Sequence, residues 1–189
     1  MKKGIVILGS TGSIGRSTLD VIERRQDEFE VIGLACRENV QLFSEQIRKF
    51  RPRLACIADG SRSHLVDFGK TRSLFGPEGM KALVRAEGEM IVNALPGSIG
   101  LESTIEALTQ KKVLGLANKE SLVMAGRLIS RLAREKGATL LPICHVGWRR
   151  ACSGVTAFNS SFERFLKGPP EAVMKSDSVS SLPLPSRSW

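Results

Sequence analysis

The stretch from Gly4 to Thr18 constrains the fold of this chain more than any other. Ile5 to Leu8 is a continuous apolar run rich in β-branched residues, which is typical of a strand buried on both faces. Glycines then recur at three-residue spacing, and a helical pattern begins within the same stretch. The three glycines are Gly9, Gly12 and Gly15, and the expected core face of the helix carries Ile14, Thr18, Val21 and Ile22.

A strand, a glycine-rich turn and a helix in this order predict a dinucleotide site, where a pyrophosphate rests on backbone N–H groups at the helix N-terminus. Gly9 would permit the tight turn, Gly12 would let the phosphates approach, and Gly15 would let the helix pack close to the strand. The spacing G-x-x-G-x-x-G is a variant of G-x-G-x-x-G, so a tight turn without a ligand is the alternative. A P-loop is excluded, because Arg16 stands where that motif needs Lys.

Six short apolar segments alternate with helical patterns, which predicts an α/β fold with a doubly wound, parallel, Rossmann-like sheet. Residues 61–73 are expected to be irregular, with a short helix around Leu65. We expect residues 1–143 to form this domain and residues 144–189 to form an irregular, poorly ordered tail. The expected strands are residues 5–8, 29–35, 54–58, 90–95, 113–117 and 138–142.

Composition narrows the classes of function. The net charge of +9 favours acidic ligands such as phosphates. Nucleic acid is the weaker alternative, because the basic residues are spread along the chain without interleaved aromatic residues. The chain has no tyrosine, which excludes a short-chain dehydrogenase with its Tyr-x-x-x-Lys pair.

The sequence also gives expectations about location and redox state. No apolar run approaches the roughly 20 residues of a membrane helix, and Met1 leads almost directly into the first strand, so we expect a cytoplasmic protein. The four cysteines lack zinc spacing, and Cys36 and Cys56 are expected to be reduced and buried.

The second expected strand leads into Cys36-Arg37-Glu38-Asn39, where a Rossmann fold meets the adenosine ribose. An acidic residue at this point binds the 2′-hydroxyl of NAD, whereas an arginine accommodates the 2′-phosphate of NADP. Arg37 therefore favours NADP, and Glu38 leaves NAD open. Asn39 is suited to cap the helix that follows.

A third polar turn, Asn118-Lys119-Glu120, follows the strand predicted at 113–117. It offers an amide, a cation and a carboxylate at the edge where ligands bind in such sheets. The structural alternative is that Asn118 caps a helix and Glu120 complements its dipole.

Three motifs together resemble one family, 1-deoxy-D-xylulose 5-phosphate reductoisomerase. The resemblance runs from about residue 3 to Pro142 and corresponds to the N-terminal NADPH-binding domain. It implies an enzyme that rearranges its substrate and reduces the product with NADPH, needs Mg²⁺ or Mn²⁺, serves isoprenoid synthesis and forms a homodimer. The motifs are Ile7-Leu-Gly-Ser-Thr-Gly-Ser-Ile-Gly-Arg-Ser-Thr-Leu-Asp20, then Asn93-Ala with Gly97-x-x-Gly100-Leu-x-x-Thr104, and Ala117-Asn-Lys-Glu-Ser-Leu-Val123.

The resemblance also implies roles for single residues. It implies that the pyrophosphate of NADPH is bound by Thr11, Gly12, Ser13 and Ile14. The adenosine end would meet Arg37 and Asn39. The nicotinamide would lie near Asn118 and Glu120, and Lys119 would reach the sugar-phosphate substrate.

The resemblance ends after Pro142. The family continues with Asp-Ser-Glu-His, whose two carboxylates bind the metal, whereas this chain has Cys144-His-Val146-Gly. Oxygen ligands suited to Mg²⁺ or Mn²⁺ are therefore missing, and we expect no catalytic residues, no metal site and no turnover by these residues alone. A nucleotide-binding module without a catalytic role is the alternative; a Rossmann oxidoreductase of other chemistry is disfavoured, because no other acid–base pair is visible.

The abruptness of this break suggests a frame-shifted reading of a reductoisomerase gene after about residue 143. Residues 179–185 can be encoded by codons that, when the reading frame is shifted by two bases, translate into Ile-x-Thr-Ala-Ser. This is part of a segment that the family carries later in its sequence. Sequencing the coding DNA decides between this hypothesis and a genuine tail.

Overall fold

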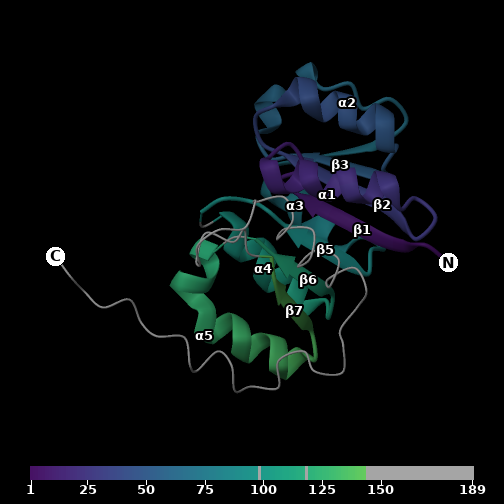
Figure 1. Cartoon of the computed structure of the whole chain (residues 1–189). Coiled ribbons are helices and arrows are strands. Elements are labelled where there is room, and N and C mark those ends of the chain that lie inside the picture. Colours follow the sequence, from purple (N-terminus) through teal and green to yellow (C-terminus); the bar gives the residue numbers. More distant parts are fainter. Residues whose placement is uncertain (98, 118, 144–189) are drawn as a thin grey trace, which may run out of the picture.

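The computed structural model describes residues 1–97, 99–117 and 119–143 of the chain. Strands and helices alternate, and the strands form one parallel sheet of order β4-β3-β2-β1-β5-β6-β7 (Figure 1). The strands are β1 (Lys3–Leu8), β2 (Phe29–Cys36), β3 (Leu54–Ile57), β4 (Arg72–Phe75), β5 (Met90–Asn93), β6 (Val113–Leu116) and β7 (Thr139–Pro142). The helices are α1 (Ser13–Arg24), α2 (Val40–Phe50), the 3₁₀ helix η1 (Gly60–Leu65), α3 (Gly76–Arg85), α4 (Ile99–Thr109) and α5 (Lys119–Lys136).

Helices cover both faces of the sheet, because the central strands alternate between two cores. Ile5 and Ile7 of β1 pack with α1 and α2. Val6 and Leu8 of the same strand pack on the other face with α3, α4 and α5. All four side chains are fully buried, which explains why β1 is apolar at every position.

The chain changes direction across the sheet next to β1. From β1 it runs outward through β2, β3 and β4, and it then returns to place β5 on the other side of β1 (Figure 1). Ligands of open parallel sheets bind at such a switch point, beyond the carboxyl ends of the strands. The predicted doubly wound, Rossmann-like architecture is confirmed.

Two details of the sequence reading were wrong. A seventh strand, β4, begins at the end of the region expected to be irregular and pairs with β3 at the edge of the sheet. Because an edge strand has few buried neighbours, β4 lacks the apolar run that revealed the others. Strand β5 ends at Asn93, not at Leu95.

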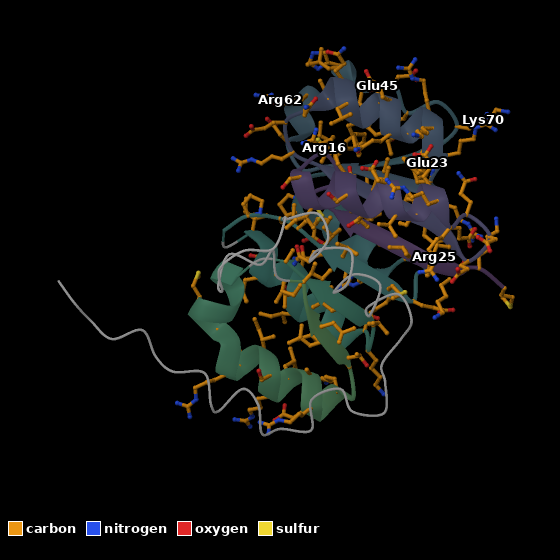
Figure 2. All side chains as sticks on the ribbon, in the orientation of Figure 1. Arg16, Glu23, Arg25, Glu45, Arg62 and Lys70 are labelled. Atoms are coloured by element: carbon orange, nitrogen blue, oxygen red, sulfur yellow. The ribbon has the colours of Figure 1, made fainter. Side chains whose placement is uncertain are left out.

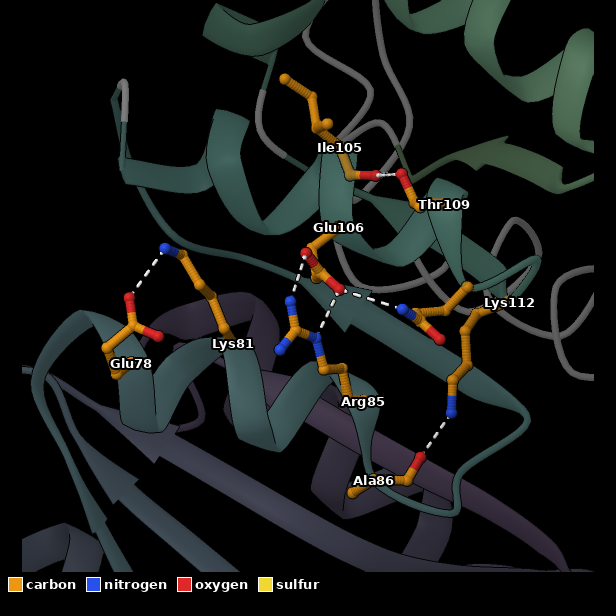
Figure 3. A network of polar contacts seen from close by, with 9 residues as sticks. Glu78, Lys81, Arg85, Ala86, Ile105, Glu106, Thr109 and Lys112 are labelled. Carbon is orange, nitrogen blue, oxygen red and sulfur yellow. Dashed lines mark hydrogen bonds and ion pairs between the residues drawn. The ribbon is translucent and has the colours of Figure 1, made fainter.

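A polar seam joins α3 to α4 on one face of the sheet. Arg85 reaches across to Glu106 with both carboxylate oxygens engaged, at 2.8 and 3.4 Å, and this contact lowers the pKa of the Glu106 carboxyl (Figure 3). Lys112 donates from Nζ to the carbonyl oxygens of Ala86 and Gly88 just beyond α3. These contacts hold the amino-terminal edge of the sheet, opposite the predicted site.

Two further observations concern the cysteines and the length of the helices. Cys36 and Cys56 are buried and unpaired, as predicted. Among the described residues, no helix is long and apolar enough to cross a membrane.

Candidate dinucleotide-binding site

The glycine turn lies at the centre of the carboxyl edge of the sheet. The backbone N–H groups of Gly9 and Ser10 both donate to the carbonyl of Ala35 in β2, at 3.0 and 2.8 Å. On the other side, Ala94 donates from its N–H to Leu8 at 2.9 Å. The turn is therefore held between the ends of β2 and β5, at the switch point.

Two of the three glycines are required by the packing of the turn itself. Gly9 has φ +85°, and a Cβ there would lie 2.9 Å from the carbonyl oxygen of Ala94. Gly15 is buried in α1, and a Cβ there would lie 2.3 Å from the Gly9 oxygen and 2.6 Å from the Ser10 Cα. Helix α1 therefore lies directly against the turn, which confirms the structural roles predicted for both residues.

Gly12 differs, because the protein itself leaves room for a side chain. It is exposed, its φ is −73°, and the nearest atom to a Cβ would be the Gly9 oxygen at 3.4 Å. The packing of the protein therefore does not require a glycine here, whereas the close approach of a pyrophosphate would.

The N-terminus of α1 presents N–H donors at this point. Gly12 is the N-cap, and no side chain caps the helix. Within the described residues, the N–H groups of Thr11, Ser13 and Ile14 have no protein acceptor, whereas the Gly12 N–H donates to the Gly9 oxygen at 3.1 Å. Free N–H groups and the positive end of a 12-residue helix make an anion-binding surface.

The end of β2 connects this turn to the predicted adenosine side. The Thr11 Oγ1 and Cys36 Sγ atoms are 3.5 Å apart, and the Cys36 thiol donates to the carbonyl of Asn39 at 3.5 Å. Burial raises the pKa of the Cys36 thiol above its ordinary value. The Cys36 side chain thus contacts both Thr11 of the glycine turn and Asn39 at the start of α2.

Beyond Cys36, the chain exposes the two charged residues that lie where the sequence predicts the adenosine ribose. Arg37 and Glu38 form an ion pair with Nε and Oε1 3.5 Å apart, and both side chains are more than half exposed. Asn39 accepts a hydrogen bond from the Leu42 N–H at 3.1 Å, which confirms it as the cap of α2. The bond uses one of the two lone pairs of Asn39 Oδ1, so the second lone pair and the amide nitrogen are left for other contacts.

A buried amide shapes the connection between β5 and α4, beside the glycine turn. Asn93 is fully buried and donates from Nδ2 to the carbonyl of Gly100 at 2.8 Å and to Thr104 Oγ1 at 3.0 Å. Its Oδ1 accepts from the Leu95 N–H at 3.2 Å. The residues Asn93, Gly100 and Thr104 of the second sequence motif thus hold the loop beside the glycine turn.

The third predicted turn lies only partly in the described structure. Lys119 and Glu120 begin α5, directly beyond β6, so their backbone lies at the carboxyl edge. Their side chains and all of Asn118 lie outside the described residues. Their contacts with a nicotinamide or a substrate stay predictions.

The sequence reading missed one pair of residues behind the glycine turn. Gln46 of α2 and Ser10 are both buried and share two hydrogen bonds, of 2.7 Å and 2.9 Å. A signal was present, because Gln46 falls on the helix face that carries Phe43 and Phe50, where an apolar residue is expected.

A metal ion finds no donor set in the described part of the chain. No group of three or more His, Cys, Asp or Glu residues is gathered there in a way that could hold one. Cys144, His145 and Val146 lie outside the described residues. The described residues therefore fit a dinucleotide and do not fit a catalytic metal.

Charges over the layer of α1 and α2 are mixed in sign. Figure 2 shows Glu23 and Glu45 among the basic residues of this layer. Lys49 pairs with Glu23 at 2.7 Å, and Arg25 pairs with Glu28 at 2.7 Å. Acidic side chains thus interrupt the basic ones, unlike a surface built for nucleic acid.

Comparison with known proteins agrees with this geometry. The family model of 1-deoxy-D-xylulose 5-phosphate reductoisomerase matches residues 5–126. A relative of that name from Caldanaerobacter subterraneus subsp. tengcongensis is 43% identical over 146 residues, which cover 76% of this chain and 38% of the relative. The chain thus spans about 38% of the length of the curated relatives it matches.

Solved structures of the same name share the fold. The Zymomonas mobilis reductoisomerase in complex with NADPH has a TM-score of 0.72 and 35% identity, over 76% of this chain and 39% of its own. Another, in complex with NADPH, fosmidomycin and magnesium, has a TM-score of 0.68 and 34% identity, over 75% of this chain and 36% of its own.

Proposed function

Because the chain belongs to the 1-deoxy-D-xylulose 5-phosphate reductoisomerase family, we propose that it is the NADPH-binding part of such an enzyme. One observation carries the proposal. At the switch point of the sheet, an exposed Gly12 and unpaired N–H groups at the start of α1 leave room for a pyrophosphate. The solved relatives that share this fold include complexes with NADPH.

The proposal assigns the cofactor to residues along the carboxyl edge. Arg37 meets the 2′-phosphate and Asn39 the adenosine, while the nicotinamide lies toward the start of α5. When bound, NADPH supplies the hydride for reducing the rearranged sugar phosphate. The pyrophosphate rests on Gly9, Thr11, Gly12, Ser13 and Ile14, the nicotinamide near Asn118 and Glu120, and the substrate near Lys119.

The 2′-phosphate assignment predicts a difference between cofactors. NADPH should bind more tightly than NADH, and Arg37→Ala should weaken NADPH by about tenfold or more through the loss of one charge-assisted contact. The affinity of Arg37→Ala for NADH should be almost the same as that of the wild type. Fluorescence titration of both cofactors at fixed salt measures this, with Arg48→Ala on the exposed side of α2 as the matched control. A wild-type preference for NADH would instead make Glu38 the reader of the ribose.

We propose further that residues 1–143 form the cofactor domain and that these 189 residues do not turn over alone. Cys144 and Val146 occupy the positions that carry the metal-binding carboxylates in the family. Mg²⁺ or Mn²⁺ should therefore show no micromolar site by calorimetry, and no product should form with substrate, NADPH and excess Mn²⁺. A micromolar metal site, or turnover, would contradict this expectation.

A further inference from the structure

The buried pair behind the glycine turn has a geometry that bears on the cofactor. Gln46 donates from Nε2 to the carbonyl oxygen of Ser10 at 2.9 Å, and the Ser10 hydroxyl donates to Gln46 Oε1 at 2.7 Å. Gln46 is 6% exposed and Ser10 is fully buried. The Gln46 amide therefore bonds to both the backbone and the side chain of Ser10, a residue 36 positions away in the sequence.

The first of these bonds fixes the orientation of one peptide unit. In a trans peptide the C=O and the following N–H point in opposite directions, and the described chain has no cis peptide. Because the Ser10 carbonyl points at Gln46, the Thr11 N–H points away from it, out of the interior. This N–H has no acceptor among the described residues, whereas those of Gly9, Ser10 and Gly12 all donate to backbone carbonyls.

The same peptide takes no part in the hydrogen bond that closes the turn. The turn is closed by the Gly12 N–H and the Gly9 carbonyl at 3.1 Å. Ser10 and Thr11 are its two central residues, and their shared peptide takes no part in that closing bond. The Gln46 bond adds a restraint on this peptide from outside the turn, and accepting that bond at the carbonyl also makes the N–H a stronger donor.

We propose that Gln46 is a positioning residue for the cofactor, which holds the Ser10–Thr11 peptide so that the Thr11 N–H faces the pyrophosphate. The proposal rests on the proposed function, because it concerns the same anion site. Gln46 does not touch the cofactor. Gln46 fixes the direction of the Thr11 N–H before the cofactor binds, so that less conformational entropy of the turn is lost on binding.

Gln46→Met tests the proposal, since it keeps the length of the side chain and removes both hydrogen bonds. The dissociation constant for NADP⁺ should rise about tenfold, as for one lost hydrogen bond to a charged group. The preference for NADP⁺ over NAD⁺ should stay unchanged, because both carry the pyrophosphate and the 2′-phosphate site is untouched. Calorimetric titration of the full chain with each cofactor gives both numbers.

A control separates aiming from general stability. Ser44 lies on the same helix, is also buried, and bonds to the Val40 carbonyl and the Asp67 N–H, away from the turn. Ser44→Ala should lower the melting temperature and leave the affinity for NADP⁺ unchanged. An equal loss of affinity in Ser44→Ala would overturn the aiming role.

Gln46→Glu gives a second readout that does not depend on the fold tolerating methionine. A protonated glutamic acid can donate to the Ser10 carbonyl and accept from the Ser10 hydroxyl, as glutamine does, whereas the carboxylate cannot donate. Burial raises the pKa of such a carboxyl into mildly acidic solution. The affinity of Gln46→Glu for NADP⁺, divided by that of the wild type at each pH, should therefore recover as the pH falls.

The outcomes divide cleanly between this inference and the proposed function. Wild-type binding with an unchanged affinity in Gln46→Met, or a pH-independent ratio in Gln46→Glu, would overturn the aiming role and leave the cofactor site standing. Failure of the wild-type chain to bind NADP⁺ at all would overturn both.

Discussion

Gly15→Ala is expected to lower the free energy of unfolding by about 3 kcal/mol or more, because the added Cβ meets backbone on two sides. It would lie 2.3 Å from the Gly9 oxygen and 2.6 Å from the Ser10 Cα. Neither atom can move aside as a side chain would, since the turn is bonded to β2 through Ala35. Chemical denaturation followed by circular dichroism measures the loss.

Gly126→Ala provides the matched comparison for this prediction. Gly126 lies in α5, directly after the kink at Ala125, and no atom of the described residues stands within 4 Å of its added Cβ. That substitution should leave the free energy of unfolding unchanged or raise it by up to about 1 kcal/mol. Similar values for the two variants would show that α1 does not lie against the turn as described.

Gly12→Val should have the opposite profile, with an intact fold and cofactor binding reduced by a hundredfold or more. The backbone at Gly12 is extended, with φ −73° and ψ 170°, and there is ordinary room for a Cβ. The valine methyl groups would stand where the pyrophosphate must approach the N–H groups. Loss of two hydrogen bonds to a charged group, each of about 1.5 kcal/mol or more, gives that factor.

Gly60→Val controls for the size of the substitution. Gly60 is exposed beyond β3, two strands from β1, and its added Cβ would be 3.7 Å from Phe75 Cβ. NADPH titration and circular dichroism of both variants decide the matter. Undiminished NADPH affinity in a folded Gly12→Val variant would mean that the glycine is only part of a turn.

The fold was predictable from the sequence where burial on both faces forces an apolar run. Strands β1, β2, β3, β5 and β6 are of this kind, whereas β7 is an edge strand whose Leu140 and Leu141 are half-buried against the two cores. Each of the six was located to within two residues at either end. Strand β4 was not predicted, because it is a half-exposed edge strand whose four residues contain no apolar run. Its pairing with β3 depends on long-range contact rather than on local composition.

The candidate site divides in the same way. The glycine spacing and the Asn39 cap are local patterns, so the sequence alone predicted them. The contact between Ser10 and Gln46 is made by the fold, which places the start of α1 and the middle of α2 on one face of the sheet. A polar residue on an apolar helix face indicates that some buried partner exists, but its identity requires the structure.

The central claim is that a dinucleotide binds at the start of α1, and amide chemical shifts test it most directly. NADP⁺ added to the ¹⁵N-labelled full chain should shift the N–H resonances of Thr11, Gly12, Ser13 and Ile14 most, with a second group at Arg37 and Asn39. NAD⁺ should move the first group and leave Arg37 nearly unchanged. Saturating NADP⁺ that leaves Thr11 to Ile14 in place, or shifts residues elsewhere instead, would contradict the account.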